Sequence, residues 1–195
     1  RIQNEFGISF IHVTHTQMEA IALADLVVVM DQGHIEQAGS AREVFDRPRT
    51  GYVARFIGGQ NVVAGKVVER GSGTVTIDSG GKTVTLTAPE TVPGAGSNFQ
   101  IAVRRDRVQL SRADGGNERL PVNAVAGKVK ALEYQGSWLK ITIENACGEE
   151  FVVNQTDQLF FADPLEPGDS VMAQWKAAEV HFLIDAGDPR RGGGH

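Results

Sequence analysis

His15 is the residue whose position in the sequence most strongly suggests chemistry. It lies in the run Thr14-His15-Thr16-Gln17-Met18-Glu19-Ala20, between an apolar strand predicted over Ile8–Val13 and a helix predicted over Gln17–Ala24. An imidazole held at a strand end can exchange a proton or hydrogen-bond a phosphate. The alternative is a half-buried histidine that only starts a helix. The sequence shows no nucleophile near His15, which disfavours a hydrolase built on this residue.

Three arginines, Arg104, Arg105 and Arg107, form the second candidate site. Guanidinium groups bind oxyanions and carboxylates, so this basic patch could hold an anion or meet an acidic partner surface. The alternative is a solvated strand edge, because charged side chains commonly protect exposed edges from pairing.

Gly81-Lys82-Thr83 imitates the end of a phosphate-binding loop. Such a loop needs a glycine five residues before the second glycine and a helix after the lysine, but position 76 is threonine and a strand is predicted next. Ser79-Gly80-Gly81-Lys82 is therefore expected to be a hairpin turn. The histidines lack the spacing of metal ligands, and no metal site is predicted.

The elements that must position these residues divide the chain into two parts. Residues 1–58 alternate strand and helix signals, with a strand at Leu26–Met30, a turn at Gln32-Gly33 and a helix opened by Ser40. Residues 59–187 carry short β-type runs separated by turn residues, which is typical of a barrel or sandwich. Residues 188–195 are expected to form a flexible tail. The predicted class is mainly β, preceded by a small α/β segment.

The amino-acid composition and charge disfavour several classes of protein. The 195 residues are 41% hydrophobic and 22% charged, with a net charge of −5 and a pI near 5.5. This balance argues against nucleic acid as a partner. A single cysteine, Cys147, excludes an internal disulfide and is compatible with a reducing cytoplasm. No apolar run is long enough to span a bilayer, and the missing initiator methionine suggests a piece of a longer protein.

Together, several short motifs resemble the C-terminal part of ATP-binding subunits of ABC importers. The run around His15 resembles the switch-histidine region T-H-D-Q-x-E-A, with Thr16 in place of the usual Asp. Phe56-Ile57-Gly58…Asn61 resembles the F-I-G-x-x-N junction that follows in that family. Ala102–Val108, Tyr134–Ser137 and Pro167–Val171 resemble segments of the TOBE domain, an OB-like β module. The likeness covers nearly all of residues 1–185 and is most similar to spermidine/putrescine importers, with ferric-iron importers next.

The resemblance implies an OB-like TOBE β-barrel domain preceded by a remnant of an ABC ATPase domain. It implies that His15 contacts the γ-phosphate of ATP in the whole subunit, with ATP and Mg²⁺ as cofactors. The Walker A loop, the signature and the Walker B strand are not in this sequence, so the chain alone is expected to bind no cofactor and to be inactive. Of the three arginines, only Arg104 matches the family's I-R-P-E segment.

The same resemblance implies partners and a location. A second ATP-binding subunit would form a homodimer, transmembrane permease subunits would bind the ATPase, and a periplasmic solute-binding protein would act indirectly. The location would be the cytoplasmic face of the bacterial inner membrane. Contacts with the second subunit are expected from four aromatic residues: Tyr134, Trp138, Phe160 and Phe161.

One alternative function remains open from the sequence. The chain could be a self-contained OB-like module that binds an oxyanion or an oligonucleotide, with aromatic residues stacking bases.

A further expectation concerns the order of the N-terminal segment. Residues 1–38 would be loosely ordered or paired with another molecule, because the strand Ile8–Val13 has no predicted neighbours of its own.

Overall fold

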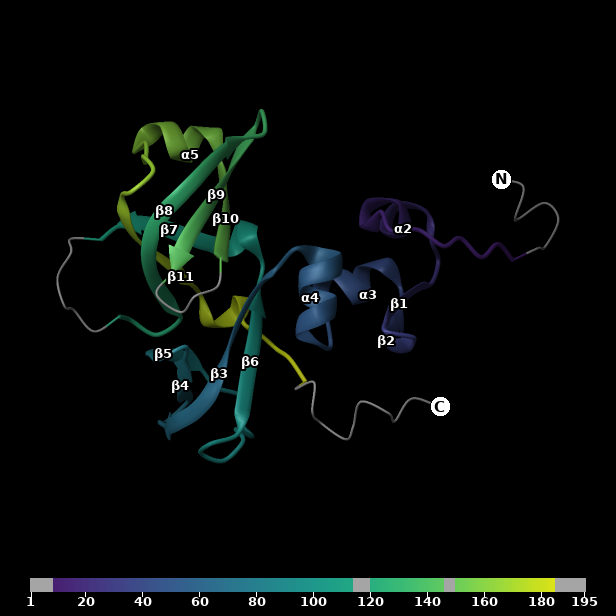
Figure 1. Cartoon of the computed structure of the whole chain (residues 1–195), viewed down its shortest axis with the longest axis horizontal. Coiled ribbons are helices and arrows are strands. Elements are labelled where there is room, and N and C mark those ends of the chain that lie inside the picture. The colour runs from purple at the N-terminus through teal and green to yellow at the C-terminus, as the bar shows by residue number, and fades with distance from the viewer. Residues whose placement is uncertain (1–8, 114–119, 146–149, 185–195) are drawn as a thin grey trace.

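The computed structural model describes residues 9–113, 120–145 and 150–184 (Figure 1). The mainly β class predicted from the sequence is confirmed, with short helices concentrated in the N-terminal part. The tail predicted at 188–195 lies outside the described residues, as does Cys147. Every helix among the described residues is too short or too polar to cross a lipid bilayer.

The N-terminal part is a small α/β unit at one side of the molecule (Figure 1). Its elements are α2 (Gln17–Leu23), β1 (Val27–Asp31), β2 (His34–Gly39), α3 (Ala41–Asp46) and α4 (Gly51–Gly58). β1 and β2 form an antiparallel hairpin. Its turn places Gln32 at φ +47° and Gly33 at φ +82°, as predicted for this pair. Ser40 and Thr50 cap α3 and α4 by accepting from the amides of Glu43 and Val53.

The strand predicted over Ile8–Val13 is wrong for the described residues 9–13, which form no strand. Phe10, Ile11 and Val13 are 64%, 94% and 91% exposed. A strand that is apolar on both faces is stable only between hydrogen-bonded neighbours, and β1 pairs with β2 instead.

Residues beyond Gly59 form two five-stranded antiparallel sheets (Figure 1). The lower sheet has the order β12-β6-β3-β4-β5 and the upper sheet the order β10-β9-β8-β11-β7. Their strands are β3 (Asn61–Arg70), β4 (Thr74–Ser79), β5 (Lys82–Thr87), β6 (Asn98–Val103), β7 (Val108–Arg112), β8 (Ala124–Tyr134), β9 (Trp138–Asn145), β10 (Glu150–Thr156), β11 (Ser170–Trp175) and β12 (His181–Phe182). Among the described residues, the hydrogen-bonded ladders form two packed sheets and no closed barrel, within the barrel-or-sandwich class that the sequence predicted.

The remaining elements connect these strands. They are the 3₁₀ turns η1 (Arg105–Arg107) and η2 (Ala177–Glu179) and the helix α5 (Asp157–Ala162). The sequence interpretation missed α5, although Thr156 caps it by accepting from the Leu159 amide. It also missed β7, which pairs with β11.

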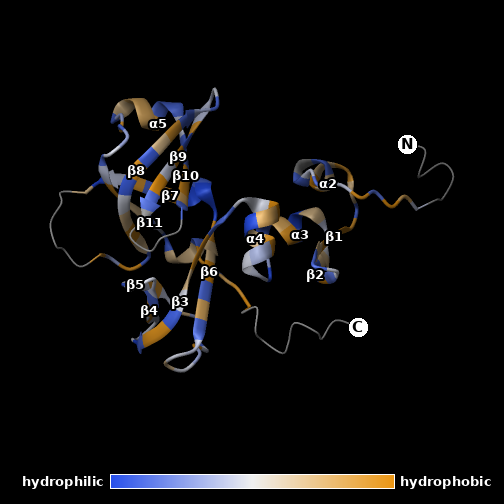
Figure 2. Cartoon of the chain, viewed as in Figure 1, coloured by the Kyte–Doolittle hydropathy of each residue, from blue (hydrophilic) through white to orange (hydrophobic). Residues whose placement is uncertain are grey.

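One hydrophobic core joins the two sheets. Ile77 and Leu86 from the lower sheet and Ile141, Ile143 and Phe151 from the upper sheet belong to the same buried cluster. Hydrophobic and hydrophilic residues alternate along β6 and β8 (Figure 2), as expected for strands with one buried face. A separate, smaller cluster lies in the N-terminal unit, around Val44 and Val53. The predicted division at residues 58 and 59 stays a prediction.

Two buried asparagines bridge distant strands. The side chain of Asn61 donates to the Val152 carbonyl (2.7 Å) and accepts from the Val152 amide (2.8 Å). Asn123 accepts from the Thr87 amide (2.8 Å) and donates to the Thr87 hydroxyl (2.7 Å). Each asparagine thereby satisfies polar groups on a strand edge that another strand does not cover.

The C-terminal segment ties the N-terminal unit to the lower sheet. His181 Nε2 donates to the Pro48 carbonyl (2.8 Å), and the Ile184 amide donates to the Arg49 carbonyl (2.8 Å). Gln100 Nε2 donates to the Ile184 carbonyl (2.9 Å). β12 therefore pairs with β6 rather than with the upper sheet that precedes it in the chain.

Candidate functional site

His15 lies just before α2 and is exposed to solvent. Thr16 occupies the N-cap position, but its hydroxyl makes no capping bond. Thr14 Oγ1 instead accepts from the Thr16 amide (2.9 Å) and donates to the Glu19 carboxylate (2.9 Å). The hydrogen bonds at the start of α2 therefore do not involve the His15 imidazole. In the described part of the chain, both ring nitrogens of His15 remain available to bind another group.

The hairpin predicted at Ser79–Lys82 is confirmed. Gly80 and Gly81 have φ values of +63° and +83°, the conformation of a two-residue primed turn between β4 and β5. The Gly81 amide donates to Asp78 Oδ1 (2.8 Å). Gly81 and Lys82 therefore do not form a phosphate loop, since no helix follows them.

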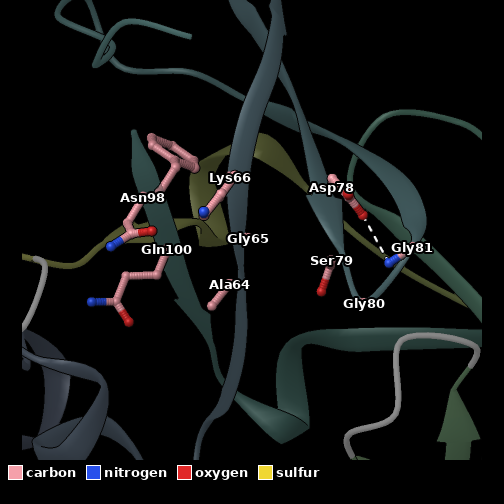
Figure 3. Close-up of a pocket in the computed structure, with 10 residues that line it drawn as sticks. Ala64, Gly65, Lys66, Asp78, Ser79, Gly80, Gly81, Asn98 and Gln100 are labelled. Atoms are coloured by element: carbon pink, nitrogen blue, oxygen red, sulfur yellow. Dashed lines mark hydrogen bonds between the residues drawn. The ribbon is translucent and has the colours of Figure 1, made fainter. Parts of the chain in front are cut away.

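This turn lines an open groove with β3 and β6 (Figure 3). Lys66, Asn98 and Gln100 point outward from the two strands, and Asp78 and Ser79 stand across the groove from them. No residue predicted as a site from the sequence lies in this groove. Gln100 is already bonded to the C-terminal segment.

The four aromatic residues predicted at a subunit contact separate into exposed and buried members. Tyr134 and Phe161 are 63% and 62% exposed, with ring centroids 6.5 Å apart. Phe160 is 6% exposed and belongs to the core, where its ring supports Phe161 edge-on at 5.4 Å. Trp138 is partly buried. Tyr134 and Phe161 therefore form an exposed aromatic pair. Leu159, on the same helix as Phe161, is 60% exposed.

The arginine cluster lies where α3, α4 and η1 approach one another. Arg104 binds Asp106 through Nε and Nη2 (both 3.0 Å) and reaches Asp46 on α3 with Nη1 (3.3 Å). Its guanidinium also lies 5.4 Å from the centre of the Phe45 ring, a cation–π distance. Arg107 Nε is 3.7 Å from Asp106 and 3.9 Å from Glu179. Two of the three arginines are thus neutralised within the chain.

Arg105 differs from its two neighbours. It is partly buried, its Nε is inaccessible and without a hydrogen-bond partner, and no carboxylate of the described residues pairs with it. Burial lowers the pKa of the Arg105 guanidinium. The sequence predicted all three arginines as one patch, whereas in the described part of the structure Arg104 and Arg107 have carboxylate partners and Arg105 has none.

Asp106 makes the cluster sensitive to acid. Partial burial alone would raise the pKa of the Asp106 carboxyl, but the hydrogen bond and charge of Arg104 outweigh it and hold that pKa below its usual value. The contribution of the ionised Asp106 carboxylate to folding stability is complete above the unfolded-state pKa of about 4. It is lost as the pH falls through the folded-state pKa of this carboxyl.

We therefore expect Asp106→Asn to flatten the acid limb of stability. The variant should lose less unfolding free energy than the parent between about pH 5 and pH 2, because it takes up no proton at this position. Urea denaturation at a series of pH values measures this difference. Glu90→Gln, in an exposed loop, controls for the loss of one negative charge. An unchanged slope in Asp106→Asn would contradict the assignment.

Among the described residues, the hydrogen bonds and ion pairs of the arginine cluster do not include His15, so the structure does not join the two into one site. Asp46, Glu179 and Gly59 complete the cluster and were not found from the sequence. Only Gly59 carried a local signal, as the glycine that ends α4 in the left-handed conformation (φ +53°).

Comparisons with known proteins found a family model and curated relatives that this chain is similar to. Residues 101–183 match the TOBE domain family. Spermidine/putrescine import ATP-binding protein PotA of Thermobifida fusca is 31% identical over 185 residues, covering 94% of this chain and 47% of the relative. Alpha-glucoside transport ATP-binding protein AglK of Rhizobium meliloti is 40% identical over 108 residues, covering 54% and 30%. The chain spans half or less of the length of these curated relatives.

A solved structure shares the fold. The cytoplasmic molybdate-binding protein ModG, crystallised with molybdate bound, superposes with a TM-score of 0.51 at 23% identity. The match covers 64% of this chain and 96% of that one. At this identity the likeness concerns the arrangement of strands alone.

Proposed function

Since this chain carries a TOBE domain and is related to the ATP-binding subunits of ABC importers, we propose that it is the C-terminal region of such a subunit. Residues 1–58 would complete an ATPase domain, and residues 59–187 would form its attached regulatory β domain. The whole subunit would hydrolyse ATP with Mg²⁺ to drive uptake of a small solute. It would act at the cytoplasmic face of the inner membrane, with permease subunits and a periplasmic solute-binding protein.

The open apolar face of the β1–β2 hairpin is the observation that carries this proposal. Val28, Met30 and Ile35 lie on one face and are 46%, 54% and 62% exposed. Val27 and Val29 lie on the other face and are buried in the small core of the N-terminal unit. A two-stranded sheet with a bare apolar face is marginal in water, and such a face marks a surface that another element covers.

The covering element that fits is the remainder of an ATPase domain. Leu23 and Leu26, at the end of α2 and before β1, are also exposed, at 80% and 63%. A self-contained OB-like module would have no use for this surface, because it lies outside the core that the two five-stranded sheets share. The proposed subunit uses it as an internal contact.

His15 would then act on nucleotide bound by the rest of the domain. Its imidazole makes no bond in the described part of the chain that would compete with a phosphate oxygen, and it is exposed just before α2. When ATP is bound, the nucleotide supplies the γ-phosphate, and His15 would hydrogen-bond it and help to hold the attacking water.

Polyamine is the solute we assign, because relatives named as spermidine/putrescine importers match more than nine tenths of this chain. The contact with a second ATP-binding subunit is assigned to the exposed aromatic pair of Tyr134 and Phe161. Exposed aromatic side chains are enriched in protein interfaces, which supports this assignment.

Hydrogen exchange tests the proposal. We compare this chain alone with a chimera in which the preceding half of the Thermobifida fusca relative is joined to its N-terminus. The amides of β1 and β2 are expected to exchange at least about tenfold more slowly in the chimera, because covering the apolar face suppresses local opening. Amides of β4 and β5 serve as the internal control and should exchange equally in both. Equal exchange of β1 and β2 in a folded chimera would contradict the proposal.

A further inference from the structure

The C-terminal segment, residues 181–184, is hydrogen-bonded to strand β6 of the lower sheet. Its first two residues form β12, the edge strand that pairs with β6. Beyond β12, the Leu183 amide donates to the Gln100 carbonyl (3.1 Å), and Gln100 Nε2 donates to the Ile184 carbonyl (2.9 Å). In Figure 1 this segment is the yellow stretch beside β6.

The same segment also reaches the loop that joins α3 to α4 in the N-terminal unit. His181 Nε2 donates to the Pro48 carbonyl (2.8 Å), and the Ile184 amide donates to the Arg49 carbonyl (2.8 Å). The two ends of the segment therefore hold two successive carbonyls of this loop. Through these bonds, the segment connects the N-terminal unit to the lower sheet.

The α3–α4 loop is held from its other side by β2. Gln37 Nε2 donates to the Arg47 carbonyl (3.0 Å), and the Arg49 amide donates to Gln37 Oε1 (2.8 Å). The Thr50 hydroxyl donates to the Glu36 carboxylate (3.0 Å). Arg49 is therefore bonded through its amide to β2 and through its carbonyl to the C-terminal segment.

The two attachments of the loop differ in burial. Gln37 and Thr50 are 4% and 3% exposed, whereas no residue of the C-terminal segment is buried and Phe182 is 37% exposed. Solvent-exposed hydrogen bonds with little apolar area around them break in local opening before those of a buried core. The attachment to the C-terminal segment is therefore the weaker of the two.

Opening of the segment would leave the packing beneath it in place. No residue of the segment is a buried member of the core that joins the two sheets, and Phe182 adds one ring contact, to Phe99 at a centroid distance of 6.1 Å. Leu183 packs, only partly buried, on a small separate cluster. The buried members of that cluster hold α4 on β3 and β6 without it: Ala54, Val62 and Ala102.

We propose that residues 181–184 form a latch that opens as one unit and, when open, frees the α3–α4 loop from the lower sheet while both sheets and the N-terminal unit stay folded. Ile184 takes part in both attachments, with its carbonyl bonded to Gln100 and its amide to Arg49. Loss of either attachment therefore loosens the other. The latch controls how firmly the N-terminal unit is tied to the lower sheet. It concerns bonds within this chain and does not depend on the proposed function.

Amide hydrogen exchange followed by nuclear magnetic resonance tests the latch in Gln100→Glu. This change replaces the Nε2 donor by an oxygen that faces the Ile184 carbonyl. The amides of Leu183 and Ile184 should both exchange about tenfold faster or more, because local opening becomes easier. Amides of β4 and β9, and the Arg49 amide held by Gln37, should keep their rates. Gln109→Glu, at an exposed position of β7, is the control with the same change in charge.

A second variant approaches the latch from its other attachment. His181→Ala removes the bond to the Pro48 carbonyl, and the amides of Leu183 and Ile184 should again exchange faster together. His34→Ala, at an exposed histidine of β2, should leave both unchanged. Faster exchange of only one of the two amides would show independent contacts and overturn the proposal. Unchanged rates at both amides, or equally faster exchange or unfolding of β4 and β9, would also overturn it.

Discussion

Replacing Phe151 by alanine is expected to lower the free energy of unfolding by about 3–5 kcal/mol. Phe151 is 2% exposed and lies inside the core, with its ring stacked on Trp175 at a centroid distance of 5.6 Å. Truncation removes buried aromatic area and leaves a cavity that two packed sheets cannot fully collapse. Urea denaturation followed by tryptophan fluorescence measures the loss. Phe161→Ala, the same change at a 62% exposed position, should cost far less.

The same experiment on the lower sheet shows whether the two sheets unfold together. Leu86 is fully buried, and Leu86→Ala is expected to cost about 2–5 kcal/mol. Because both sheets share one core, each variant should shift a single cooperative transition rather than split it. Leu159→Ala, at a 60% exposed site, is the matched control. Two separate transitions, with only one displaced by each variant, would show that the sheets fold independently.

The sequence predicted which segments form strands better than it predicted their partners. The short β-type runs expected after residue 59 correspond to strands, because alternation and turn residues are local signals. Pairing depends on distant contacts. The observed sheets accordingly do not follow the order of the chain, because β12 crosses back to β6 and one core joins both sheets.

The segment Ile8–Val13 was predicted as a strand, but its described residues do not form one. Its apolar residues match a buried strand in composition, but composition does not supply hydrogen-bonded neighbours. The sequence expected residues 1–38 to be loosely ordered or paired with another molecule. Within this segment, Gln17–Leu23 forms a helix, and Val27–Asp31 pairs with the strand that begins at His34. The two strands of the hairpin hydrogen-bond to each other, and the face that carries Val28, Met30 and Ile35 stays exposed to solvent.

The candidate site was predictable only in part. Three arginines within four positions identify a basic patch, but they look equivalent in the sequence. Which arginine has a carboxylate partner depends on residues far along the chain. Arg104 pairs with Asp46, 58 positions away, and Arg107 pairs with Glu179, 72 positions away. The unpaired state of Arg105 follows from the packing of η1 between α4 and β10, which no local pattern encodes.

ATP hydrolysis by the chimera described above tests the central claim most directly. If residues 1–58 complete an importer ATPase domain around His15, the chimera should hydrolyse ATP, and His15→Ala should lower kcat by about 100-fold or more with little change in KM. His34→Ala, at an exposed histidine of β2, should stay within about twofold of the parent. A folded chimera that hydrolyses ATP equally well with and without the His15 imidazole would contradict the account.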